Sequence, residues 1–131
     1  MKVDANLGPR AVALETTLLL HGVPRSESLS LAAELVEIVR SEGAEPALTG
    51  VVKGRPVVGM TQETLATLLD EGDVLKVNTA NLGYALYAGF SGATTVATTM
   101  ELAAAAGVRV FATGGIGGVH RGYGEHWDIS A

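Results

Sequence analysis

The sequence contains no cysteine, few aromatic residues and no cluster of basic residues. Without cysteine the chain has no disulfide framework, no thiolate-bound zinc and no thiol nucleophile. Its formal net charge of −5 argues against a nucleic-acid polymer as partner, because phosphate backbones are held by basic patches. It also lacks an apolar run long enough for a leader or a membrane span. We therefore expect a cytoplasmic protein that binds neither a membrane nor a nucleic acid.

What the sequence does contain is a high share of apolar residues. Hydrophobic residues make up 47% of the 131 residues and charged residues 18%, which is typical of a chain that folds rather than of a disordered one. The length suits about one domain. With 17 glycines and only 5% aromatics, the core must be built mainly from Val, Leu and Ala. This mix favours an α/β architecture.

Hydrophobic patterning alternates between strand-like and helix-like segments. The short apolar run 11–14 predicts a buried strand, and polar residues at helical spacing predict a helix over 26–42. The same criteria predict further strands at 46–52, 56–60, 74–77 and 108–113, and helices from Thr61 to 69, at 80–89 and at 98–106. The alternation predicts a layered α/β fold with a parallel or mixed sheet.

The glycine-rich segment 113–122 carries the strongest chemical signal, because glycines directly after a strand let backbone N–H groups approach an anion. Its candidate anion-binding residues are Thr113, Gly114, Gly115, Gly117, Gly118, His120 and Arg121. The pattern is neither a Walker loop, since no Gly-Lys-Ser/Thr follows, nor a dinucleotide fingerprint, since His120 stands where the third glycine would be. The segment therefore indicates an anion cradle, and an ordinary glycine-rich loop with a solvated Arg121 is the alternative.

Two charged residues stand at the ends of predicted strands. Glu15 follows the strand at 11–14, where a carboxylate can serve as acid or base; the alternative is a carboxylate that pairs with a lysine or faces water. Lys76 lies in the strand at 74–77 and can bind a substrate phosphate as a compact charge, unless its ammonium group simply extends into solvent.

Two segments that contain histidine are less specific. His21 follows three leucines, and we interpret it as a buried histidine with its hydrogen bonds satisfied. Near the end of the chain, Glu125, His126 and Asp128 offer ligands for a divalent ion. Such short clusters are usually surface, so spacing alone leaves a metal site open.

Taken in order, these segments resemble the pseudouridine-5′-phosphate glycosidases, a family that includes proteins of indigoidine gene clusters. The resemblance covers almost the whole chain from Ala11, and the stretches that carry it are 12–15, 21–24, 92–100, 111–122 and 128–131. It implies an α/β/α fold, usually trimeric. The implied enzyme is a glycosidase of the carbon–oxygen lyase class in nucleoside catabolism, which reversibly splits the C–C glycosidic bond of pseudouridine 5′-phosphate into uracil and ribose 5-phosphate.

The resemblance also implies roles for single residues. Glu15 matches the family's proton donor, Asp128 matches a manganese ligand, and the glycine segment matches the phosphate cradle. Substrate contacts match Lys76, Val96, Ser130 and Ala131. A base that is joined to the sugar by a C–C bond does not leave unaided. The family therefore opens the sugar ring and forms an imine with an enzyme lysine, and the acid protonates the base.

The chain departs from the family pattern at two places. The imine-forming lysine of the family lies in a strand beyond the Asp-Ile-Ser-Ala motif, and no residue of this chain matches it. Where the family has Ser-Arg-Arg-Asp-Leu, this chain has Asn78-Thr79-Ala80-Asn81-Leu82. We therefore expect residues 1–131 to be the amino-terminal part of a single α/β glycosidase domain, truncated before the lysine and inactive alone. A non-catalytic sugar-phosphate-binding module and a structural remnant are the alternatives.

Overall fold

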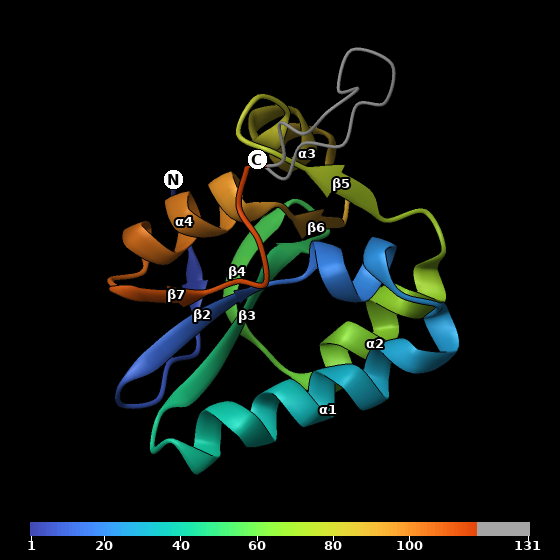
Figure 1. Cartoon of the computed structure of the whole chain (residues 1–131). Helices are drawn as coiled ribbons and strands as arrows, with labels where there is room; N and C mark the ends of the chain where they lie inside the picture. Colours follow the sequence, from blue (N-terminus) through green and yellow to red (C-terminus); the bar gives the residue numbers. More distant parts are fainter. Residues whose placement is uncertain (118–131) are drawn as a thin grey trace.

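One mixed sheet of seven strands has helices on both faces, in a computed structural model that describes residues 1–117 (Figure 1). The strands are β1 (Asp4–Ala5), β2 (Ala11–Glu15), β3 (Glu45–Val52), β4 (Arg55–Met60), β5 (Leu75–Val77), β6 (Gly92–Thr94) and β7 (Val110–Ala112). The helices are the short π-helix η1 (Leu18–Gly22) and the α-helices α1 (Arg25–Ser41), α2 (Gln62–Glu71), α3 (Leu82–Ala88) and α4 (Val96–Ala105). The predicted α/β fold with a mixed sheet is confirmed.

The order of the main strands is β1-β4-β3-β2-β7, with β2, β3 and β7 parallel to one another and β4 antiparallel to β3. β2 pairs with β3 only as far as Thr49, and β6 then pairs with Gly50 and Val51 in the antiparallel direction. β4 pairs with one edge of β3, so β2 and β6 share the other edge: β2 pairs with the first part of β3 and β6 with the last part. The carboxyl ends of β2 and β6 therefore meet, and those of β2 and β7 lie at the same edge.

Two apolar clusters cover the two faces of the sheet, because successive side chains of a strand point to opposite faces. In β2, Ala13 packs in the cluster under α3 and α4, and its neighbour Leu14 packs in the cluster under α1 and α2. The same alternation holds in β3 for Ala47 and Leu48. The sheet is thus the middle layer of three, as Figure 1 shows, with α4 on one side and α1 and α2 on the other.

Local signals explain several element boundaries. The hairpin between β3 and β4 turns at Lys53 and Gly54, which both have positive φ, and it joins the strands predicted at 46–52 and 56–60. Thr61 accepts a hydrogen bond from the backbone N–H of Thr64 and caps α2, also as predicted. Within the described residues no helix is long and apolar enough to cross a membrane.

Other expectations need correction. α4 begins at Val96 rather than at 98, and the strand expected over 108–113 is only the three residues of β7. β1, η1 and β6 were not predicted, because each is too short to show a period. His21 is exposed rather than buried, although its Nε2 lies 2.8 Å from the carbonyl oxygen of Val74.

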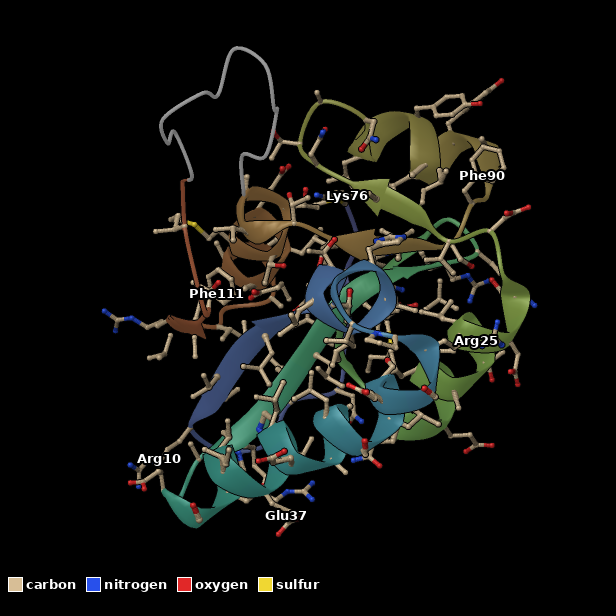
Figure 2. The ribbon with its side chains drawn as sticks, turned by 45° about the vertical axis from the view of Figure 1, so that its right-hand side comes forward. Arg10, Arg25, Glu37, Lys76, Phe90 and Phe111 are labelled. Atoms are coloured by element: carbon tan, nitrogen blue, oxygen red, sulfur yellow. The ribbon has the colours of Figure 1, made fainter. Side chains whose placement is uncertain are left out.

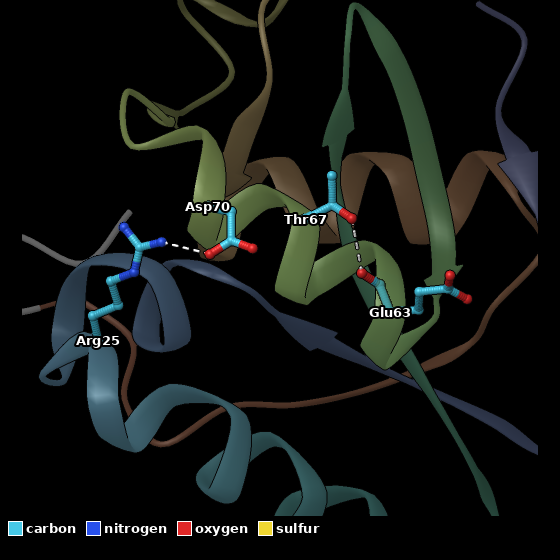
Figure 3. Close-up of polar contacts among 4 residues, drawn as sticks. All are labelled: Arg25, Glu63, Thr67 and Asp70. Atoms are coloured by element: carbon cyan, nitrogen blue, oxygen red, sulfur yellow. Dashed lines mark hydrogen bonds and ion pairs between the residues drawn. The ribbon is translucent and has the colours of Figure 1, made fainter.

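An exposed ion pair links the first turn of α1 to α2. The guanidinium of Arg25 lies 2.8 Å from Oδ1 of Asp70, and the hydroxyl of Thr67 donates to the carbonyl oxygen of Glu63 one turn earlier in α2 (Figure 3). Both charged side chains are largely exposed, so the pair contributes at most about 1 kcal/mol. The packing of α1 on α2 therefore depends on the apolar cluster beneath them.

Candidate functional site

The predicted acid and the start of the glycine segment meet at the carboxyl ends of β2 and β7. The parallel register places Leu14 opposite Ala112, so the residues that follow, Glu15 and Thr113, lie side by side. The hydroxyl of Thr113 donates to Oε1 of the half-buried Glu15 at 2.9 Å. This hydroxyl also lies 3.0 Å from the carbonyl oxygen of Gly115 and accepts its N–H at 3.3 Å. Because a hydroxyl has one proton, donation to Glu15 competes with donation to Gly115.

Four buried threonines hold the backbone next to Glu15, and we call them the threonine seam: Thr16, Thr49, Thr94 and Thr99. The hydroxyl of Thr16 donates to the carbonyl oxygen of Thr49 at 2.7 Å and accepts the backbone N–H of Thr94 at 3.1 Å. The hydroxyl of Thr94 lies 2.7 Å from the same carbonyl oxygen and 2.8 Å from the hydroxyl of Thr99. The seam therefore bridges the place where β2 and β6 both end, and it ties both strands to α4.

The amino terminus of α4 lies directly beyond the seam. Val96, which the resemblance matches to a substrate contact, is the first residue of this helix, and the side chain of Thr95 makes no capping hydrogen bond. The backbone N–H of Thr95 donates to the carbonyl oxygen of Val77 in β5. The buried hydroxyls of Thr17, Thr95 and Thr98 have no hydrogen-bond partner within residues 1–117. Unpartnered donors at a helix amino terminus suit an anion.

Lys76 lies in β5, the strand whose Val77 accepts the hydrogen bond from the backbone N–H of Thr95 at the start of α4. It is exposed and pairs in register with Ala93 of β6. Its neighbours Leu75 and Val77 pack in the cluster under α3 and α4, so Lys76 points away from that cluster. Figure 2 shows Lys76 in the upper half of the view, apart from Phe111 at β7. Among the described residues, the Lys76 ammonium forms no ion pair with Glu15.

The segment that replaces the family's arginines has a structural role that sequence reasoning missed. The side chain of Asn78 accepts the backbone N–H groups of Ala80 and Asn81 at 3.0 and 3.2 Å. The side chain of Asn81 accepts the N–H of Asn78 at 2.9 Å and donates to the carbonyl oxygen of Lys76 at 3.1 Å. The two asparagines thus fix the turn between β5 and α3. The recurrence of Asn at three-residue spacing before a helix was the available signal.

The remaining predicted site residues fall outside residues 1–117: Gly118, His120, Arg121, Asp128, Ser130 and Ala131. Of those inside, Gly114 and Gly115 have open space where a Cβ atom would stand, and Gly117 has a φ of 87°. Within the described part of the chain, no three His, Asp or Glu side chains come together to hold a metal ion. The described site is therefore a carboxylate, a hydroxyl, a glycine segment and a helix amino terminus.

These features define an α/β protein with a candidate ligand site at the carboxyl ends of its strands, which is where open α/β sheets bind ligands. Residues 4–131 match the protein family described as indigoidine synthase A like protein. The chain belongs to this family.

Relatives and solved structures agree with this assignment. The chain is 50% identical over 125 residues to the pseudouridine-5′-phosphate glycosidase of Chloroflexus aurantiacus and 48% identical over 124 residues to that of Herpetosiphon aurantiacus. Each match covers 95% of this chain but only 41% of the relative. The chain thus spans less than half the length of the curated relatives it matches.

Two crystal structures share the fold. An indigoidine synthase A-like protein from Thermotoga maritima superposes with a TM-score of 0.84 at 36% identity, over 92% of this chain and 41% of its own. The prealnumycin C-glycosynthase AlnA, in complex with ribulose 5-phosphate, superposes with a TM-score of 0.77 at 34% identity, over 99% of this chain and 45% of its own.

Proposed function

We propose that this chain supplies the acid and part of the sugar-phosphate site of a pseudouridine-5′-phosphate glycosidase, which reversibly splits a C–C glycosidic bond to give uracil and ribose 5-phosphate. The observation that carries the proposal is the Glu15 carboxylate, held by Thr113 at the start of the glycine segment. The names of the relatives and the C-glycosynthase neighbour support C-glycoside chemistry for the family.

In this proposal Glu15 delivers the proton that the departing base carbon needs. The donation from Thr113 makes Oε1 an acceptor, which directs the acidic proton to Oε2. The threonine seam fixes the backbone on the other side, through Thr16. Together the two contacts hold the carboxyl group from its side chain and from its strand, which is the kind of orientation that proton transfer requires.

The sugar phosphate is proposed to lie between the glycine segment and the amino terminus of α4. The dipole of α4 supplies positive potential there, and the buried hydroxyls of Thr95 and Thr98 at the start of this helix have no hydrogen-bond partner within residues 1–117. Binding of ribulose 5-phosphate by AlnA supports a ligand of this class. Contacts from Lys76, His120, Arg121, Ser130 and Ala131 remain predictions, as do a trimeric assembly and a cytoplasmic location.

Manganese at Asp128 is part of the proposal, and no chemical step is assigned to it. Hard divalent ions take several oxygen ligands, and the described residues gather no such group. We therefore expect weak uptake of manganese by this chain. Titration calorimetry of the chain and of its Asp128→Ala variant tests this; tight binding that the substitution abolishes would contradict it.

A chimeric enzyme tests the role of Glu15. In it, this chain replaces the matching part of the Chloroflexus aurantiacus glycosidase, and release of uracil from pseudouridine 5′-phosphate is measured. We expect Glu15→Gln to lower turnover by at least about 100-fold while substrate still binds, because the amide keeps the shape but donates no acidic proton. The matched control is Glu101→Gln, at an exposed glutamate of α4, which should change little. Unchanged turnover in Glu15→Gln would remove Glu15 from the mechanism.

A non-catalytic sugar-phosphate-binding module is the second candidate. It is favoured by the amino terminus of α4, whose dipole and unpartnered hydroxyls suit an anion whether or not a reaction follows. We expect no enzyme-like turnover by the 131-residue chain itself. Calorimetry with ribose 5-phosphate, in parallel with the uracil assay, separates the two functions: binding by a catalytically silent chimeric enzyme would favour the module.

A further inference from the structure

The side chain of His21 joins two segments that are far apart in the sequence. Its Nε2 lies 2.8 Å from the carbonyl oxygen of Val74, 53 positions further along the chain. Because a carbonyl oxygen only accepts, Nε2 carries the proton and donates this bond. His21 lies in η1, which begins shortly after Glu15, and Val74 directly precedes β5, the strand that contains Lys76. One hydrogen bond thus joins the segment that follows the acid to the segment that leads to the lysine.

The backbone of η1 is fixed on the side of the acid. The backbone N–H of Leu20 donates to the carbonyl oxygen of Thr16, a member of the threonine seam, at 3.0 Å. Leu19 is fully buried, and its carbonyl oxygen accepts the hydroxyl of Ser28 in α1 at 2.6 Å. π-Helices are rare and often lie at functional sites. His21 therefore extends from a backbone that the seam and α1 hold in place.

β5 is short, and within residues 1–117 its only strand partner is β6. At its start the backbone N–H of Leu75 donates to the carbonyl oxygen of Ser91, and at its end the carbonyl oxygen of Val77 accepts the backbone N–H of Thr95. Both bonds hold β5 from the side of β6 and α4. The bond from His21 holds it from the side of η1.

The side chain of Lys76 lies on the same face of the sheet as η1. Leu75 and Val77 pack in the cluster under α3 and α4, so Lys76, between them, points to the opposite face. Leu20 of η1 and Val74 both pack against the cluster on that opposite face, under α1 and α2. A shift of β5 relative to η1 would therefore move the ammonium group of Lys76 relative to the site.

We propose that His21 is a positioning residue, whose hydrogen bond to Val74 holds Lys76 in place for substrate binding. The proposal rests on the proposed function, in which Lys76 contacts the sugar phosphate. His21 acts through the backbones of η1 and β5 and takes no part in the chemistry. Position matters here because substrate contacts that are displaced by about 1 Å lose much of their effect. Since the hydrogen bond is exposed, the expected effect on binding is moderate.

The test uses the chimeric enzyme with pseudouridine 5′-phosphate as substrate. His21→Ala should raise KM by about five- to tenfold and leave kcat within about twofold, because binding through Lys76 weakens while Glu15 keeps its donor Thr113. His21→Gln should restore KM to within about twofold of the parent, because its amide N–H can replace that of Nε2.

The matched control is Arg25→Gln. Arg25 lines the same small hollow as His21 and Val74, but its ion pair with Asp70 joins α1 to α2 and not to β5 (Figure 3). This variant should leave KM unchanged. An equal rise of KM in Arg25→Gln and His21→Ala would overturn the proposal, because the effect would then follow from any loss of packing at this place. A Gln variant no better than the Ala variant would overturn it too.

A double-mutant cycle separates positioning from a merely structural role. Lys76→Ala removes the ammonium group that His21 is proposed to hold in place. Adding His21→Ala to this variant should therefore raise KM by less than about a further twofold. If the two effects multiply instead, His21 acts independently of Lys76 and the proposal is wrong.

Two readouts distinguish failure of this proposal from failure of the proposed function. If the parent chimeric enzyme releases no uracil, the glycosidase function fails, and calorimetry with ribose 5-phosphate then compares the variants. Binding by His21→Ala should be about fivefold weaker than binding by the parent and by His21→Gln. Amide hydrogen exchange of Leu75 and Val77 should also become about fivefold faster in His21→Ala. Unchanged exchange would refute the tie between η1 and β5 even if no ligand binds.

A second variant covers the case in which His21→Ala does not fold. His21→Asn keeps a polar side chain, but its amide is too short to replace Nε2 as a donor to Val74. It should show the same rise of KM and the same faster exchange in β5. Asn and Gln variants that behave alike would contradict the proposal, because only the Gln side chain can restore the bond.

Discussion

The threonine seam and β7 flank the same glutamate but are built in opposite ways. In the seam, three buried hydroxyls and one backbone N–H are satisfied by one another and by the carbonyl oxygen of Thr49. β7 has one strand partner among the described residues and alternating exposed side chains. Glu15 thus has its backbone fixed by the chain's own core, while its side chain depends on Thr113 at the open edge. Substitutions in the two regions should separate stability from function.

The largest effect on stability is expected from the apolar packing that supports the seam. Leu102 of α4 is fully buried in the cluster under that helix, and Leu102→Ala should lower the free energy of unfolding by about 2–5 kcal/mol through a lost side chain and a cavity. Met100→Ala, in the same helix but at a side chain 52% exposed beside β7, should cost about 0.5 kcal/mol. Urea unfolding of both variants measures the contrast. Similar losses would show that the β7 side is packed as firmly as the seam.

A medium effect is expected from the seam itself. Thr16→Val keeps the shape but leaves the buried N–H of Thr94 without its acceptor, at a cost of about 1–3 kcal/mol. Thr16→Ser restores the hydroxyl and should recover most of that loss. The same unfolding measurement applies. A Val variant as stable as the Ser variant would mean that the Thr16 hydroxyl does not bind the seam together.

The smallest effect on stability is expected at the end of β7. Thr113 is exposed, so Thr113→Val should change the free energy of unfolding by no more than about 0.5 kcal/mol. In the chimeric enzyme the same change should lower uracil release by about tenfold or more, because Glu15 loses the donor that orients it. Thr113→Ser should rescue turnover. A Val variant with full activity would show that orientation of Glu15 comes from elsewhere.

The helices and long strands were predictable because these segments are long enough for the spacing of their apolar residues to show a period. α1, α2 and the hairpin of β3 and β4 begin and end close to where apolar spacing, Thr61 and the Lys53-Gly54 turn place them. β6 escaped prediction because its three small residues, Gly92–Thr94, show no alternation. They form a strand only because Val77 and Val51 lie on either side.

The contacts among the candidate site residues could not be predicted from the sequence. Glu15 and Thr113 stood out as strand-end groups, but their pairing follows from the parallel register of two strands that are far apart in the chain. The threonine seam could not be recognised in the sequence, because threonine is common in strands and the hydrogen bonds of the seam depend on the gap between β2 and β6. The asparagine turn at Asn78 and Asn81 was noted only as a departure from the family pattern, whereas it holds the backbone around Lys76.

The pairing of β2 with β7 sets an order in which the protein is completed during synthesis. Thr16 and Thr94 are 78 positions apart, and Glu15 and Thr113 are 98 positions apart. A chain that emerges from the ribosome amino end first can close the seam while β7 is still unmade. Until residue 113 is made, Glu15 therefore lies on an anchored strand while its side chain lacks the donor that orients it, and it acquires this donor after the seam can already have closed.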